Sequence, residues 1–122
     1  MSSRKSRKLE EKTAKDFIGG KVQIASGALP FWKQDVSADN FLIEHKYTEP
    51  YTKGYVLKKS YFKSVIDEAF KLGKLPMMVI EFTGKPELRV AVIRYEDALA
   101  LDRLLKLEEE YYHDGIEKDL NT

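Results

Sequence analysis

The stretch "KQDVSADNFLIEHKY", residues 33–47, predicts a β-hairpin that carries charges on one of its faces. Alternation along an extended strand puts Glu44 and Lys46 on the same side. If Asp39-Asn40 forms a two-residue turn, Asp35 lies opposite Glu44 across the ladder. Side chains paired in this way stand roughly 5 Å apart, so two carboxylates would repel each other unless a cation lay between them. Lys46 is one candidate for that cation, and a metal ion is another.

The elements around this hairpin predict an α/β fold with one mixed sheet and helices on its faces. The first helix is expected from about Arg7 to Ile18 and is ended by a glycine pair. A second helix, capped by Ser60, is expected to reach about Leu72. The apolar run "PMMVIEF" is typical of a strand covered on both faces. With strands "KVQIA" and "LRVAVIR" and a final helix from about Glu96, the expected order is αβββαββα.

Apolar side chains mark the inner face of each expected helix. In the first helix they are Ala14, Phe17 and Ile18, with Glu10 and Glu11 one turn earlier on that face. In the second they are Phe62, Val65, Ile66 and Ala69. The last helix has a leucine stripe formed by Leu99, Leu101, Leu104, Leu105 and Leu107.

The composition predicts an intracellular, cytoplasmic protein. Its 122 residues, 43% of them hydrophobic and 34% charged, suit a single domain over 1–122, with a basic tail at 1–6 and a loosely tethered acidic end from about 113. Apolar runs are too short to cross a membrane, and no secretory signal is recognisable. Because cysteine is absent, disulfides and thiolate zinc sites are excluded. Oxygen ligands would favour magnesium or manganese.

Charge is unevenly distributed although the net charge is only +1. The first 21 residues carry seven bases against three acids, whereas residues 96–122 carry nine acids against three bases. A basic end is compatible with a face for a polyanion such as nucleic acid. An equally good interpretation is a frayed basic tail together with a solvated acidic helix.

The motif of Asp35 followed by Glu44-His45-Lys46, after a helix that carries an acid, resembles the PD-(D/E)xK nuclease superfamily and its restriction-endonuclease-like fold. The longer segment "GGKVQIASGALPFWKQDVSADNFLIEHKYTE" is similar to one shared by archaeal-type Holliday junction resolvases and related phage enzymes. "LPMMVIEF" resembles the strand after their second core helix. The resemblance covers about residues 7–94. Gln34 stands where the superfamily's name has proline, and the segment between Ser26 and Asp35 is longer than in compact archaeal members.

This resemblance implies a metal-dependent nuclease centre. Asp35 and Glu44 would hold Mg²⁺, for which Mn²⁺ could substitute, together with the backbone carbonyl of His45. Lys46 would orient or deprotonate the attacking water or stabilise the transition state. Glu10 or Glu11 would bind a second metal or position water, with Glu11 fitting the distance to the glycine pair slightly better. Ser26 would contact the scissile phosphate.

DNA contacts are expected from the Ser-Gly loop and from lysines. Ser26 and Gly27 would meet phosphate oxygens, although an ordinary strand-ending turn is the alternative. The basic candidates are Arg4, Lys5, Arg7, Lys8, Lys33, Lys53, Lys58 and Lys59. Each, taken alone, also suits a solvated surface position.

The function that the resemblance implies is resolution of branched DNA, specifically four-way junctions, and the resemblance is compatible with a phage origin. Because such a junction presents two symmetry-related phosphates, a homodimer is expected. A nicking, repair or replication nuclease on duplex, flap or single-stranded DNA is the first alternative, because fold does not fix substrate. A catalytically silent nucleic-acid-binding module is the second.

Overall fold

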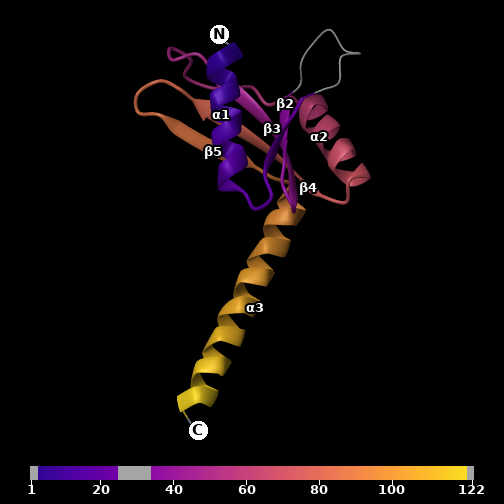
Figure 1. Cartoon of the computed structure of the whole chain (residues 1–122), viewed down its shortest axis with the longest axis vertical. Coiled ribbons are helices and arrows are strands. Elements are labelled where there is room, and N and C mark those ends of the chain that lie inside the picture. The colour runs from indigo at the N-terminus through magenta and orange to yellow at the C-terminus, as the bar shows by residue number, and fades with distance from the viewer. Residues whose placement is uncertain (1–2, 25–33, 121–122) are drawn as a thin grey trace. The chain divides into compact units, whose positions relative to one another are not determined.

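The computed structural model describes the backbone of residues 3–24 and 34–120 and the side chains of residues 7–23 and 36–112. The chain divides into two compact units, Met1–Val92 and Ile93–Thr122, which are described separately (Figure 1). The single domain expected from the chain length stays a prediction. Ser26, Gly27 and Lys33 lie outside the described residues.

The first unit contains a five-stranded mixed sheet, as expected for an α/β fold. Its described strands lie side by side in chain order, and among them only the β3–β4 pair is parallel. The strands are β1 (Lys21–Ile24), β2 (Gln34–Ser37), β3 (Phe41–Thr48), β4 (Leu75–Phe82) and β5 (Leu88–Val92). With its helices the described chain runs α1-β1-β2-β3-α2-β4-β5-α3. β4 lies between β3 and β5 and is buried along almost its whole length, which agrees with its continuous apolar sequence.

The β2–β3 hairpin has the register expected from its sequence. Asp35 pairs with Glu44, and Val36 pairs with Ile43. The Ala38 amide donates to the Phe41 carbonyl at 2.8 Å, which closes a two-residue turn at Asp39-Asn40. No described residue other than glycine has a positive φ, so this turn does not use the left-handed conformation that these two residues tolerate.

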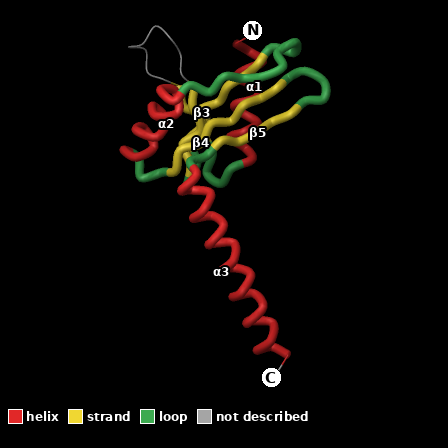
Figure 2. Tube along the Cα trace, turned by 180° about the vertical axis from the view of Figure 1, so that it is seen from behind, coloured by secondary structure: helices red, strands yellow, loops and turns green. Residues whose placement is uncertain are grey.

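Helices α1 (Ser3–Asp16) and α2 (Lys59–Lys71) cover opposite faces of the sheet (Figures 1 and 2). α1 lies over β1 and β2, and the ring of Phe17, just after α1, meets that of Phe41 edge-on at 5.8 Å. α2 lies over β3 and β4. Since side chains alternate along β3, His45 belongs to the α1 side, whereas Glu44 and Lys46 project toward α2.

The limits of α1 differ from the sequence expectation. The helix begins at Ser3 rather than near Arg7, so residues 3–6, expected within the basic tail at 1–6, have helical backbone. The helix ends at Asp16, and Ile18, expected on its apolar face, is 78% exposed. The helical period stops before Ile18, since the chain reverses at Gly19, which has a φ of +69°. Ala14 is buried as expected.

α2 packs its apolar side on β4. Val65 joins Met78 and Ile80 in a buried cluster, against which Tyr55 and Phe62 are packed. Ser60 is not the N-cap: the helix begins at Lys59, and its N-cap, Lys58, makes no side-chain capping bond. The residues before α2 therefore position the helix by packing, through Tyr55 and Leu57, rather than by a cap.

The second unit is dominated by α3 (Tyr95–Leu120), a helix of 26 residues. Arg94 anchors its first turn with two bonds to Asp97, at 2.8 and 3.0 Å. The leucine stripe expected to form an inner face is largely exposed, with Leu104, Leu105 and Leu107 at 60%, 66% and 60%. Among the described residues, no helix has the length and apolar character needed to cross a membrane.

Candidate active site

The β2–β3 hairpin brings the expected acid and lysine together on the sheet face that α2 covers. Lys46 Nζ lies 2.9 Å from Glu44 Oε1. The Glu44 side chain is only 5% exposed, whereas that of Lys46 is 32% exposed. Because alternation places i and i+2 on one face, the ion pair follows directly from the strand. The buried carboxylate of Glu44 is therefore paired with the partly exposed ammonium group of Lys46.

An aromatic ring from α2 completes the surroundings of this lysine. Lys46 Nζ lies 5.7 Å from the centroid of the Tyr61 ring, and Lys58 Nζ lies 5.5 Å from the same centroid. The π face of an aromatic ring attracts cations at such distances. Tyr61 thus gathers two ammonium groups beside a carboxylate, which concentrates positive charge at the edge of the candidate site.

Tyr55 is the second aromatic residue at this cluster. Burial raises the pKa of Tyr55, the charge of Lys46 acts against that rise, and Glu44 and Tyr61 add to it. These electrostatic effects place its hydroxyl group in the field of the Glu44–Lys46 pair. Since its ring packs on the core beneath α2, Tyr55 joins the hydrophobic cluster to the charged one.

The two acids considered on α1 occupy different environments. Glu10 is 5% exposed and lies on the side of α1 that also buries Thr13 and Ala14. Glu11 is 55% exposed and lies 3.7 Å from Arg7, one turn away. The slight preference for Glu11 came from its distance to the glycine pair, whereas the burial of these side chains favours Glu10 as the acid directed toward the sheet.

His45 faces away from the Glu44–Lys46 pair. It is 8% exposed, and neither ring nitrogen has a hydrogen-bond partner among the described residues. Burial and the charge of Arg89 lower the pKa of His45 from 6.5 to about 4, against the opposing effect of Glu81. Its imidazole is therefore neutral near pH 7, which suits a buried structural position. The expected metal contact of its backbone carbonyl stays a prediction.

The fit of a divalent metal depends on Asp35 and Glu44. Their backbones are paired directly, and paired residues project to the same face of a sheet. Two carboxylates at this spacing suit Mg²⁺, which prefers oxygen ligands. The side chain of Asp35 lies outside those described, and the described side chains contain no group of three or more acids or histidines that could hold a metal.

The basic residues expected to contact DNA lie at several places. Lys53, Lys58 and Lys59 are exposed on the segment that leads from β3 into α2, close in sequence to the Tyr61 cluster. Arg7 and Lys8 are exposed on α1. Arg4 and Lys5 belong to the helical backbone of α1, and their side chains are outside those described.

Sequence reasoning missed Tyr55 and Tyr61. The spacing of Lys58 and Tyr61, three residues apart at the start of a helix, could have indicated their contact. The contact between Tyr61 and Lys46 joins residues separated by a crossover connection, so it depends on how α2 packs on β3. Hollows in the described surface lie elsewhere. One is beside Ser37 and Lys74, one is beside Phe17 and Phe41, and one is on α3.

Comparison of the chain with protein-family models found no match, and searches of curated proteins and of solved structures found none either.

Proposed function

We propose that this protein is a metal-dependent, structure-selective DNA endonuclease that cleaves four-way junctions. The observation that carries the proposal is the hairpin itself: Asp35 is the ladder partner of Glu44, and Glu44 is ion-paired with Lys46. This arrangement agrees with the resemblance to PD-(D/E)xK nucleases. Cleavage of a phosphodiester needs an activated water and positive charge near the phosphate, which a carboxylate-bound metal and a lysine can supply.

Each residue of the hairpin motif has a defined part in this proposal. Asp35 and Glu44 would hold Mg²⁺. The helical acid stays unassigned, because α1 covers the face of the sheet opposite to the one on which Glu44 and Lys46 project toward α2. When bound, the metal would polarise the phosphate and lower the pKa of a water molecule. Lys46 acts as a cation rather than as a base, because both a carboxylate at 2.9 Å and the face of the Tyr61 ring favour its ammonium form.

The lysines beside the site suit DNA binding without base specificity. Lys58 lies against Tyr61, and Lys53 and Lys59 are exposed nearby. Phosphate contacts of this kind give affinity that falls as salt concentration rises. Since a four-way junction presents two symmetry-related strands, paired cleavage requires two sites and hence two copies of this chain.

A catalytically silent binding module is the second candidate function. The observation that favours it is the Glu44–Lys46 ion pair, because this contact compensates the buried carboxylate without a metal. The two functions differ in one property. Only the nuclease requires Mg²⁺ and an intact Glu44 for breaking a DNA strand, whereas both would bind branched DNA.

The test compares Glu44→Gln with Glu81→Gln. Glu81 is an equally buried acid in the neighbouring strand, with Arg89 Nε 2.5 Å from Oε2, and its ion pair lies on the α1 side. Both variants remove one buried charge, so their effects on thermal unfolding should be similar. We expect Glu44→Gln to lower Mg²⁺-dependent cleavage of a labelled four-way junction by at least about a hundredfold. Glu81→Gln should stay close to the wild type once both are folded.

Cleavage rates on linear duplex and flap substrates of the same sequence, compared with the rate on the four-way junction, measure the substrate preference of the enzyme. Equal cleavage of all substrates would favour a nicking or repair nuclease. Metal-independent binding with no cleavage in either Mg²⁺ or Mn²⁺ would favour the silent module. Full cleavage by Glu44→Gln would contradict the assigned site.

A further inference from the structure

α3 presents a continuous row of apolar side chains that the described structure leaves exposed. Ala100, Leu104, Leu107 and Tyr111 follow one another at intervals of four, three and four residues. This is the spacing of the inner positions of a coiled coil. Leu104 and Leu107 are each 60% exposed, and Tyr111 is 82% exposed.

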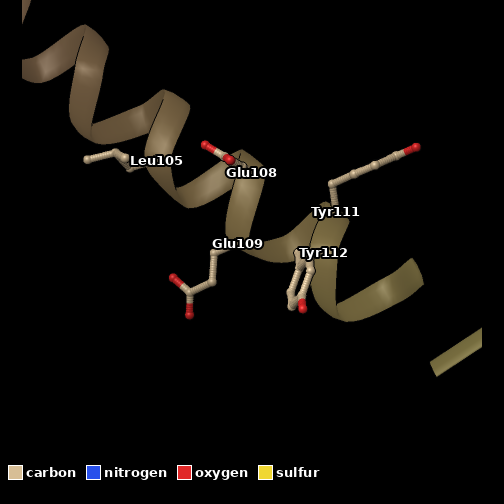
Figure 3. Close-up of a pocket in the computed structure, with 5 residues that line it drawn as sticks. All are labelled: Leu105, Glu108, Glu109, Tyr111 and Tyr112. Carbon is tan, nitrogen blue, oxygen red and sulfur yellow. The ribbon is translucent and has the colours of Figure 1, made fainter. Parts of the chain in front are cut away.

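The neighbouring row of α3 is less suited to a close helix contact. It contains Leu101, Leu105 and Tyr112, but Glu108 interrupts it. Figure 3 shows Leu105, Glu108, Glu109 and the two tyrosines projecting from this single helix. These five residues line an open hollow of about 420 Å³. A carboxylate in the middle of a buried seam would be costly. The uninterrupted row from Ala100 to Tyr111 is therefore the better contact surface.

We propose that α3 pairs in antiparallel orientation with α3 of a second copy of this chain. Centring the two-fold axis between Leu104 and Leu107 places Leu104 opposite Leu107 of the second copy. The same register places Ala100 opposite Tyr111. A small residue then faces a large one at both ends of the contact, which fills the seam evenly. The surface is self-complementary, as a two-fold interface requires.

The charges of α3 favour the antiparallel direction. Residues 108–119 carry six acids and only one lysine, whereas residues 95–107, the first half of α3, carry three acids and two bases. Parallel pairing would set the two acidic halves beside each other. Antiparallel pairing sets each acidic half beside the less acidic half and brings Arg103, at the edge of the seam, near Glu110 of the second copy.

The pairing rests on the pattern of α3 and does not depend on the proposed nuclease activity. It gives that activity a means of bringing together the two sites that a four-way junction needs. A contact made by one pair of helices is small for a stable interface, so we expect an equilibrium between monomer and dimer that depends on concentration.

The test is sedimentation of the full chain, without DNA, over a range of protein concentrations. We expect the wild type to dimerise and Leu104→Glu to weaken dimerisation at least about tenfold. Leu105→Glu is the matched control, because it is the adjacent leucine with similar exposure but lies in the interrupted row. Helix content measured by circular dichroism should be the same for both variants.

Charge reversal tests the direction of pairing. Arg103→Glu should weaken the dimer, and adding Glu110→Arg should restore it. Adding Glu108→Arg instead should restore it only if the helices were parallel, which would overturn the proposed orientation. A wild type that stays monomeric at every concentration, or a dimer broken by Leu105→Glu and kept by Leu104→Glu, would overturn the pairing. None of these readings depends on DNA cleavage, so failure of the pairing is distinguishable from failure of the proposed function.

Discussion

At the scale of single residues, the ring of Tyr61 is expected to position Lys46. The centroid of the ring lies 5.7 Å from the Lys46 ammonium group, and Glu44 contacts the same group at 2.9 Å. Tyr61→Phe keeps the π face and should preserve cleavage, whereas Tyr61→Leu removes it and should lower kcat about threefold to tenfold. The measurement is single-turnover cleavage of a four-way junction at saturating protein. A purely structural role for Tyr61 predicts a lower unfolding temperature for Tyr61→Leu and an unchanged kcat after correction for folded protein.

A pH profile of cleavage tests the role of Lys46. Among the side chains that the structure describes, the charged and titratable groups around Lys46 include Glu44 on its own strand and Tyr55, Lys58 and Tyr61 from the following segment. If Lys46 acts as a cation, the rate should fall at alkaline pH. A rate that rises as Lys46 loses its proton would instead identify it as the general base.

His45 is expected to make the fold less stable in acid. The unfolded chain takes up a proton near pH 6.5, but the folded imidazole does so only near pH 4. The free energy of unfolding should therefore fall as the pH is lowered from about 6.5 to about 4, by about 3 kcal/mol at most. His45→Leu should remove this dependence in denaturant titrations, and it should leave cleavage within about threefold because the backbone carbonyl is kept. An unchanged acid dependence would contradict this assignment.

At the scale of elements, the turn between α1 and β1 packs closely against the turn of the β2–β3 hairpin. Gly19 has a φ of +69°, and a Cβ there would lie 2.0 Å from Asp39 Oδ1. Gly73 has a similar φ but open space around it, and Gly54 has open space without positive φ. Gly19→Ala should therefore lower the free energy of unfolding most. Gly73→Ala should lower it by about 1–2 kcal/mol, and Gly54→Ala should hardly change it. Urea unfolding of the three variants gives the order, and equal losses would contradict it.

Sequence reasoning succeeded where local rules decide an element. The period of two along β3 and the turn at Asp39-Asn40 were enough to obtain the Asp35–Glu44 register, which the structure confirms. It failed where tertiary packing decides. Ser60 is a favourable cap by type, but the packing of Tyr55 and Leu57 starts α2 two residues earlier, with Lys58 at the N-cap position. Periodicity also could not separate Glu10 from Glu11, because both lie near the edge of one helical face.

At the scale of the whole molecule, the candidate site and the proposed pairing of α3 predict a difference in how many strands are cut. A dimer can cut both strands of a junction in one encounter, whereas a monomer cuts one strand and leaves. A negatively supercoiled plasmid with an extruded inverted repeat separates these outcomes, since a first nick releases the supercoiling and removes the junction. We expect wild type and Leu105→Glu to give linear product, and Leu104→Glu to give nicked circles. Linear product from Leu104→Glu at concentrations where it sediments as a monomer would show that paired cutting does not depend on α3, and a lack of any cutting by the wild type would count against the nuclease itself.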